Sequence, residues 1–69
     1  MEIIHIKDDF IKLGQLLKLA GLVDSGVDAK MDIQEGLVKV NGEVTLQRGK
    51  KVYCDDVIEY DGQKIIVKN

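Results

Sequence analysis

Residues 25–46, SGVDAKMDIQEGLVKVNGEVTL, contain a helix start, a helix end and a hairpin turn in immediate succession. The Ser25 hydroxyl can accept a hydrogen bond from a free backbone N–H, and Asp28 three residues later completes a capping-box pattern. Gly36 is expected to end the helix in a left-handed conformation. After Gly36 the apolar period changes to two, so this stretch predicts a helix followed directly by a β-hairpin.

Two hairpins are predicted from the same turn chemistry. Residues 37–46 surround Asn41-Gly42, and residues 57–68 surround Asp61-Gly62. Both dipeptides accept the positive φ angles of a type I′ turn, which joins antiparallel strands. Between the hairpins lie residues 47–51, QRGKK, a polar loop with three cations.

The preceding residues predict a short strand and a first helix. Residues 2–6 alternate in the manner of a strand. From Phe10 onward the apolar residues recur at helical spacing, and the stripe consists of Phe10, Leu13, Leu16, Leu17 and Ala20. Asp8 and Asp9 suit the positive N-terminal end of such a helix, and Gly21 is a plausible stop. The order predicts an α+β fold in which two helices pack on a small antiparallel sheet of hairpins.

Length and composition limit the possible functions. The 69 residues form a single domain, 1–69, with 45% apolar and 32% charged residues. A domain of this size buries only about 60% of its unfolded surface, which disfavours a deep pocket and therefore an enzyme. One cysteine and one histidine provide no spaced set of metal ligands, so neither a metal nor a cofactor is expected. No apolar run approaches the ~20 residues of a membrane span, and a cytoplasmic protein is expected.

Several short segments together carry a family resemblance. They are the Ser25-capped helix, the Gly36 stop, Val40-Asn41-Gly42, Arg48-Gly49-Lys50-Lys51 and Asp56-Val57-Ile58. This combination resembles the S-four-type RNA-binding domain, also called the alpha-L RNA-binding motif. The resemblance covers roughly residues 10 to 60 and is closest to the small stand-alone bacterial members of that family.

The resemblance extends to individual positions, with three departures. Lys12 and Leu13 match the start of the family's first helix, where Gly14 replaces an aspartate. Ser25 matches the serine of the second helix, and Gly26 stands where an arginine usually follows. Lys30, one turn further along, could supply the missing cation. In the third departure, the family's late glycine is Asp55.

The resemblance implies a non-catalytic protein that docks on structured RNA, either ribosomal RNA or a ribosome bearing tRNA, and that is a monomer when free. Phosphates need converging donors, and a basic loop beside a helix N-terminus offers charge and free N–H groups together. The candidate RNA-binding residues are Lys12, Ser25, Lys30, Asn41, Arg48, Lys50 and Lys51. Residues 26–30 and 48–51 would then have to share one side, with the acidic row Asp28, Asp32 and Glu35 facing away.

A protein-interaction module without RNA affinity is the alternative. The net charge of −2 favours it, as do Ile11 and Leu19, which lie outside the apolar stripe of the first helix. Tyr53 or Tyr60 could stack on a base. Both tyrosines lie in strand-like sequence, however, so core or cross-strand packing is the favoured interpretation, and no stacking platform is expected.

Overall fold

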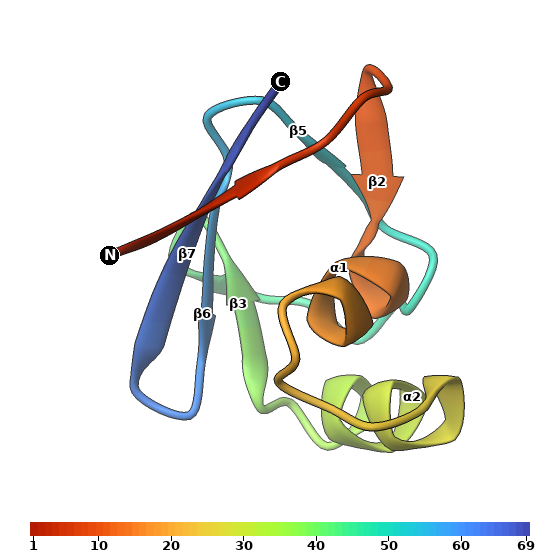
Figure 1. The fold of residues 1–69 in the computed structure, drawn as a ribbon. Helices are drawn as coiled ribbons and strands as arrows, with labels where there is room; N and C mark the ends of the chain where they lie inside the picture. Colours follow the sequence, from red (N-terminus) through yellow and green to blue (C-terminus); the bar gives the residue numbers. More distant parts are fainter.

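The elements of the fold follow the predicted order, with two short strands added at residues 10–12 and 51–53. The computed structural model describes residues 1–69, and its elements are β1 (Glu2–His5), β2 (Phe10–Lys12), α1 (Leu13–Leu19), α2 (Gly26–Gln34), β3 (Val38–Val40), β4 (Glu43–Val44), β5 (Lys51–Tyr53), β6 (Val57–Tyr60) and β7 (Gln63–Lys68). Five strands form one sheet in the order β1-β7-β6-β3-β4, and β2 pairs with β5 in a separate two-stranded ribbon. Both helices lie on the same side of the larger sheet (Figure 1).

The two predicted hairpins are confirmed. Asn41 and Gly42 have φ angles of 53° and 84°, and Asp61 and Gly62 have φ angles of 51° and 77°. The strands pair antiparallel across these turns, β3 with β4 and β6 with β7. Both registers are those of two-residue turns, as the turn residues predict.

The α+β fold class is confirmed, but the sheet is mixed and not purely antiparallel. β1 pairs with β7 in parallel, and Ile4 lies opposite Val67. Strands joined by a tight turn must run antiparallel, whereas a strand at the start of the chain has no such constraint on a partner near the end. The direction of β1 is thus set by tertiary packing and not by a turn.

The predicted start of the first helix is wrong by three residues. Residues 10–12 form β2, in which Phe10 pairs with Tyr53 and Lys12 with Lys51. Helix α1 begins only at Leu13, and no acidic residue lies in its first turn. Phe10 therefore has helical spacing from the later apolar residues without belonging to the helix. Pairing with β5 gives backbone N–H and C=O groups of residues 10–12 hydrogen-bond partners.

The core is aliphatic and lies between the helices and the sheet. Its buried members come from α1, α2, the larger sheet and β5, and they are Leu13, Leu16, Leu17, Ala29, Ile33, Val38, Val40, Val52, Ile58, Ile65 and Val67. Ile11 is half-buried against this core, whereas Leu19 is 58% exposed. Neither helix is long and apolar enough to span a membrane.

Candidate nucleic-acid interface

The polar loop 47–51 is bonded to the start of helix α1. The backbone N–H of Leu13 donates to the carbonyl oxygen of Lys50 at 2.9 Å, and that of Gly14 donates to the carbonyl of Arg48 at 3.1 Å. The first N–H groups of a helix have no acceptors within the helix itself. The loop therefore caps α1 with its main chain, and its position relative to the helix is fixed.

Gly14 makes room for the side chain of Arg48. A Cβ atom at position 14 would lie 2.7 Å from Cγ of Arg48, closer than nonbonded carbon atoms approach. The stem of Arg48 accordingly lies directly over α1. The departure from the family pattern at Gly14 thus has a consequence, because it sets the path of a cationic side chain.

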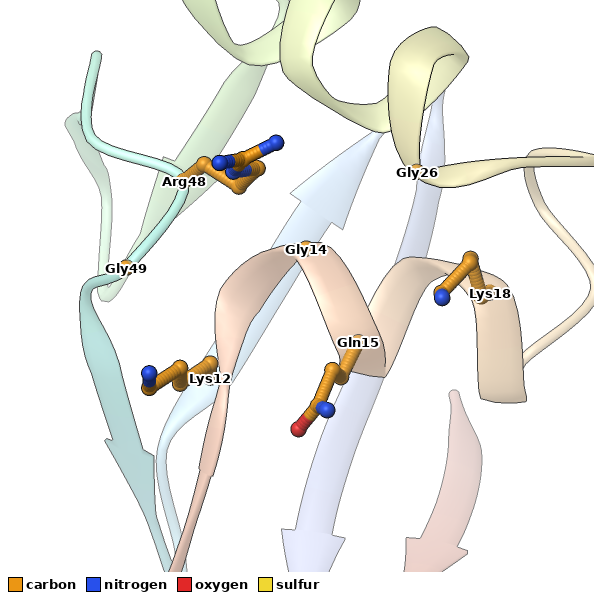
Figure 2. A pocket seen from close by; sticks show the side chains of 7 residues that line it. All are labelled: Lys12, Gly14, Gln15, Lys18, Gly26, Arg48 and Gly49. Carbon is orange, nitrogen blue, oxygen red and sulfur yellow. The ribbon is translucent and has the colours of Figure 1, made fainter.

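A hollow of about 340 Å³ opens where the loop and the two helices meet (Figure 2). Three of its lining residues are cations, none is acidic and none is hydrophobic; the set is Lys12, Gly14, Gln15, Lys18, Gly26, Arg48 and Gly49. In Figure 2 the Arg48 side chain extends from the loop toward α2, and Lys18 lies on α1 across the hollow. We call this hollow the basic hollow.

The N-terminus of helix α2 borders the basic hollow. The Ser25 side chain accepts a hydrogen bond from the Asp28 N–H at 3.2 Å, which confirms the predicted cap. Gly26, the first helical residue, lines the hollow, and a Cβ there would meet no atom within 4 Å. A helix start carries a partial positive charge and free N–H groups, which favour an anion. The missing arginine at position 26 thus leaves the backbone accessible.

Lys50 and Lys51 line a different hollow, of about 510 Å³. It lies against the same loop and is bordered by the first hairpin and by β5; its lining residues are Val40, Asn41, Glu43, Val44, Thr45, Gln47, Lys50, Lys51, Tyr53 and Asp56. We call it the hairpin hollow. The predicted loop cations are therefore divided, with Arg48 facing the basic hollow and the two lysines facing the hairpin hollow.

The Asn41 side chain is used inside the protein. Its Nδ2 donates to Oδ1 of Asp56 at 3.0 Å, and its Oδ1 accepts from the backbone N–H of Val57 at 2.9 Å. Oδ2 of Asp56 in turn accepts from the N–H of Tyr53 at 2.8 Å. Asn41 thus ties the first hairpin to β6 and to the end of β5, which shapes the hairpin hollow.

The remaining candidates and the acidic row occupy other positions. Lys30 is exposed on α2 four residues after Gly26, on the same helix face, but it does not line the basic hollow. None of the acids predicted to face away lines that hollow, and Asp32 accepts a hydrogen bond from the Tyr60 hydroxyl. This bond, with burial second, raises the pKa of Tyr60 to about 12.

Lys18 and Gln15 were not among the residues predicted to bind RNA, yet both line the basic hollow. Their spacing from Lys12 was an available signal, because residues three apart lie along one face of a helix. Two of these three positions carry a cation. The signal was missed because exposed lysines on helices are common and need no functional explanation.

Comparisons with known proteins relate this chain to an RNA-binding family. The S4 domain model matches residues 4–68. The chain is 46% identical over 59 residues to a Bacillus subtilis protein named "Probable ribosome maturation protein RlbA", a match that covers 86% of this chain and 83% of that protein. It is 36% identical over 61 residues to YbcJ of Escherichia coli, covering 88% of this chain and 87% of YbcJ.

Two solved structures have the same fold. The solution structure of Escherichia coli YbcJ, described as revealing an alphaL motif involved in RNA-binding, aligns with a TM-score of 0.76 and 33% identity over 100% of this chain and 89% of that chain. The 30S ribosomal protein S4e of Thermoplasma acidophilum aligns with a TM-score of 0.63 and 31% identity, covering 84% of this chain and 31% of that chain.

Proposed function

Because this chain belongs to the S4 domain family, we propose that it is a non-catalytic RNA-binding protein that docks on structured RNA. The observation that carries the proposal is the basic hollow, in which Lys12, Lys18 and Arg48 lie with Gly26, the first residue of α2, and which no acidic residue lines. A phosphate group needs positive charge and N–H donors from several directions. The basic hollow offers both.

The proposed mechanism is electrostatic. The three cations of the basic hollow neutralise phosphates of the RNA backbone, and the N–H groups at the start of α2 donate hydrogen bonds to one of them. Lys50 and Lys51 add two cations past the loop, in a hollow that Glu43 and Asp56 also line, and Lys30 adds one along α2. We leave the Asn41 side chain out of the binding set, since its bonds to Asp56 and Val57 assign it to the hairpins.

The partner we propose is ribosomal RNA or the ribosome itself. The name of RlbA refers to ribosome maturation, and S4e is a ribosomal protein. Both relatives support a ribosomal partner for this chain. The wide, shallow minor groove and regular backbone of helical RNA favour recognition by shape and phosphate contacts. A monomer in the cytoplasm, with little sequence preference of its own, fits this role.

The test removes the cations of the basic hollow. Lys18→Gln combined with Arg48→Gln should lower the affinity for ribosomal RNA, measured by fluorescence anisotropy across a salt series. It should also reduce the slope of log affinity against log salt by about 2, or about 1 for each lost phosphate contact. The fold should persist, because the loop caps α1 through backbone carbonyls and not through these side chains.

Lys39→Gln combined with Lys64→Gln provides the matched control. Both lysines are exposed on the larger sheet, and neither lines the basic or the hairpin hollow. The control protein should bind RNA as the unchanged protein does. Equal affinity and equal salt slope for the two double variants would disprove the role of the basic hollow.

A protein-interaction module is the second candidate. Val27 and Met31, four residues apart on α2, are 66% and 54% exposed, and Leu19 on α1 is also exposed. Exposed apolar rows of this kind are typical of protein contacts. Partners that remain bound after nuclease treatment and high salt would favour this function, since phosphate contacts would be lost or screened.

A further inference from the structure

The two-stranded ribbon of β2 and β5 presents four notable side chains on one face. Phe10 pairs with Tyr53, and Lys12 pairs with Lys51. Residues two apart in a strand share a face, so both rings and both ammonium groups belong to the same side of the ribbon. The middle residues of the two strands, Ile11 and Val52, point to the other face, where Val52 is fully buried. We call this four-residue surface the ribbon face.

The paired lysines are unfavourable for the isolated protein. Like charges directly opposite each other on paired strands repel. The ion pairs of the structure are Lys64 with Glu59 and Lys68 with Asp55, so neither ribbon lysine has a carboxylate partner. The Lys51 ammonium instead lies 4.8 Å from the centroid of the Phe10 ring. A bound anion would relieve the repulsion between Lys12 and Lys51.

The aromatic pair leaves one ring available. The centroids of Phe10 and Tyr53 are 5.9 Å apart, and the ring planes are tilted by 50°. This confirms the predicted cross-strand packing of Tyr53, yet 48% of Tyr53 remains exposed. Because Phe10 supports one part of the ring and holds it in place, the exposed part is a ready surface for stacking. The expectation of no stacking platform was made with Phe10 assigned to the first helix, whereas Phe10 lies in β2 opposite Tyr53.

The ribbon face is continuous with both hollows. Lys12 lines the basic hollow, whereas Lys51 and Tyr53 line the hairpin hollow. An RNA backbone bound in the basic hollow would thus meet Lys12 first and the paired Lys51 next. Tyr53 lies two residues beyond Lys51, on the same strand and the same face.

We propose that the ribbon face binds an unpaired nucleotide of RNA next to the docked helix. The nucleotide's phosphate lies between Lys12 and Lys51, and its base stacks on the exposed part of Tyr53. This inference rests on the proposed function and specifies its ligand as a helix with an adjoining single strand. Stacking on a ring with an adjacent cation is how proteins bind single strands without reading sequence, so any of the four bases is accepted.

The experiment compares a fluorescently labelled RNA hairpin with the same hairpin carrying a short unpaired extension, placed at either end in turn. For the unchanged protein, the better of the two extensions should increase affinity about fivefold, the lower end of what base–aromatic stacking contributes. Tyr53→Leu should abolish this gain and leave affinity for the plain hairpin unchanged. Tyr53→Phe keeps the ring and should retain the gain. Both variants place an apolar side chain at an exposed strand position, which allows folding.

A second measurement reports stacking directly. With 2-aminopurine in the extension, binding to the unchanged protein and to Tyr53→Phe should change the fluorescence of the base, and binding to Tyr53→Leu should not. An extension that adds nothing, or a Tyr53→Leu loss shared equally by both RNAs, would overturn the ribbon-face proposal while leaving the proposed function intact. Absence of binding to either RNA at low salt would instead overturn the proposed function, and this inference with it.

Discussion

At the scale of single residues, Gly14 and Arg48 form a complementary pair. The space that a side chain at position 14 would need is occupied by the stem of Arg48, whose carbonyl also accepts the Gly14 N–H. An acidic side chain at this position would neutralise the arginine, whereas glycine leaves its charge unpaired. The guanidinium therefore remains available to a ligand.

Gly14→Ala is predicted to separate binding from stability. Alanine is favoured over glycine in a helix by roughly 1 kcal/mol. This gain offsets the crowding between the new Cβ and the Arg48 side chain. The free energy of unfolding should therefore change by less than about 1 kcal/mol. The displaced Arg48 should cost about 1 kcal/mol of RNA binding, or about fivefold in affinity. Urea unfolding and fluorescence anisotropy would measure the two effects.

Combining Gly14→Ala with Arg48→Ala tests whether the loss of RNA affinity comes from the displaced arginine. In an Arg48→Ala background, Gly14→Ala should have no further effect on RNA affinity, because the displaced side chain is already absent. Additive losses in the two variants would show that Gly14 acts through some other contact.

At the scale of elements, the two hairpins have equivalent turns but different surroundings. Asn41 and Asp61 occupy the same turn position, with φ angles of 53° and 51°. Only Asn41 bonds to a distant strand, through Asp56 and Val57. The first turn therefore holds the sheet and β5 together, and the second only reverses the chain.

Asn41→Gly should destabilise the protein although glycine accepts the positive φ. Loss of the two side-chain hydrogen bonds should lower the free energy of unfolding by about 1.5 kcal/mol in urea unfolding. Asp61→Gly makes the matched change in the second turn and should change the free energy of unfolding by no more than about 0.5 kcal/mol. Equal effects in the two turns would contradict a specific tie between Asn41 and β6.

The hydrogen bond from Tyr60 to Asp32 connects β6 with α2 and makes stability depend on pH. The pKa of Tyr60 is raised from 10.0 to about 12, chiefly by this bond. The folded state thus holds the phenol proton more tightly than the unfolded state does. Its stabilising contribution is fully present below pH 10 and is lost as the pH rises through about 12.

Tyr60→Phe is predicted to remove that contribution. The variant should be less stable at neutral pH by about 1 kcal/mol, a value reduced for the partial exposure of the pair. The difference from the unchanged protein should shrink as the pH rises above 10, and thermal unfolding at a series of pH values would measure it. A difference that stays constant up to pH 12 would show that the hydroxyl bond is not its source.

For the molecule as a whole, the net charge is negative, whereas the charge of the basic hollow is positive. The chain carries a formal charge of −2, yet the basic hollow contains three cations and no acid. Long-range attraction to a polyanion is therefore weak, and local contacts must supply the binding energy. Such a protein should discriminate between RNA shapes better than a uniformly basic one.

Salt dependence is the whole-molecule prediction. If three to five phosphates are contacted, log affinity for ribosomal RNA should fall against log salt with a slope of about −2 to −4.5, since each contact contributes about −0.7 to −0.9. Fluorescence anisotropy across the salt series would give the slope, and duplex DNA should bind more weakly at every salt concentration. A slope near zero would indicate a partner held by apolar contacts.

The local structure could be predicted from short stretches of the chain, because its causes are local. The Ser25 cap, the positive φ at Gly21 and Gly36, and both turns agree with the residues that predict them. The resemblance of these segments to the S-four-type domain also led to the correct family and fold class. Backbone conformation at caps and tight turns depends on a few neighbouring residues, so short patterns suffice to predict it.

The contacts between distant residues depend on the packing of the whole chain. Pairing with β5 turned residues 10–12 into a strand, and the last strand took β1 as a parallel neighbour. The same packing placed Lys18 in the basic hollow, separated Arg48 from Lys50 and Lys51, and gave Asn41 an internal partner. Contacts between residues far apart in the chain depend on how the whole core packs, and no short pattern contains that information.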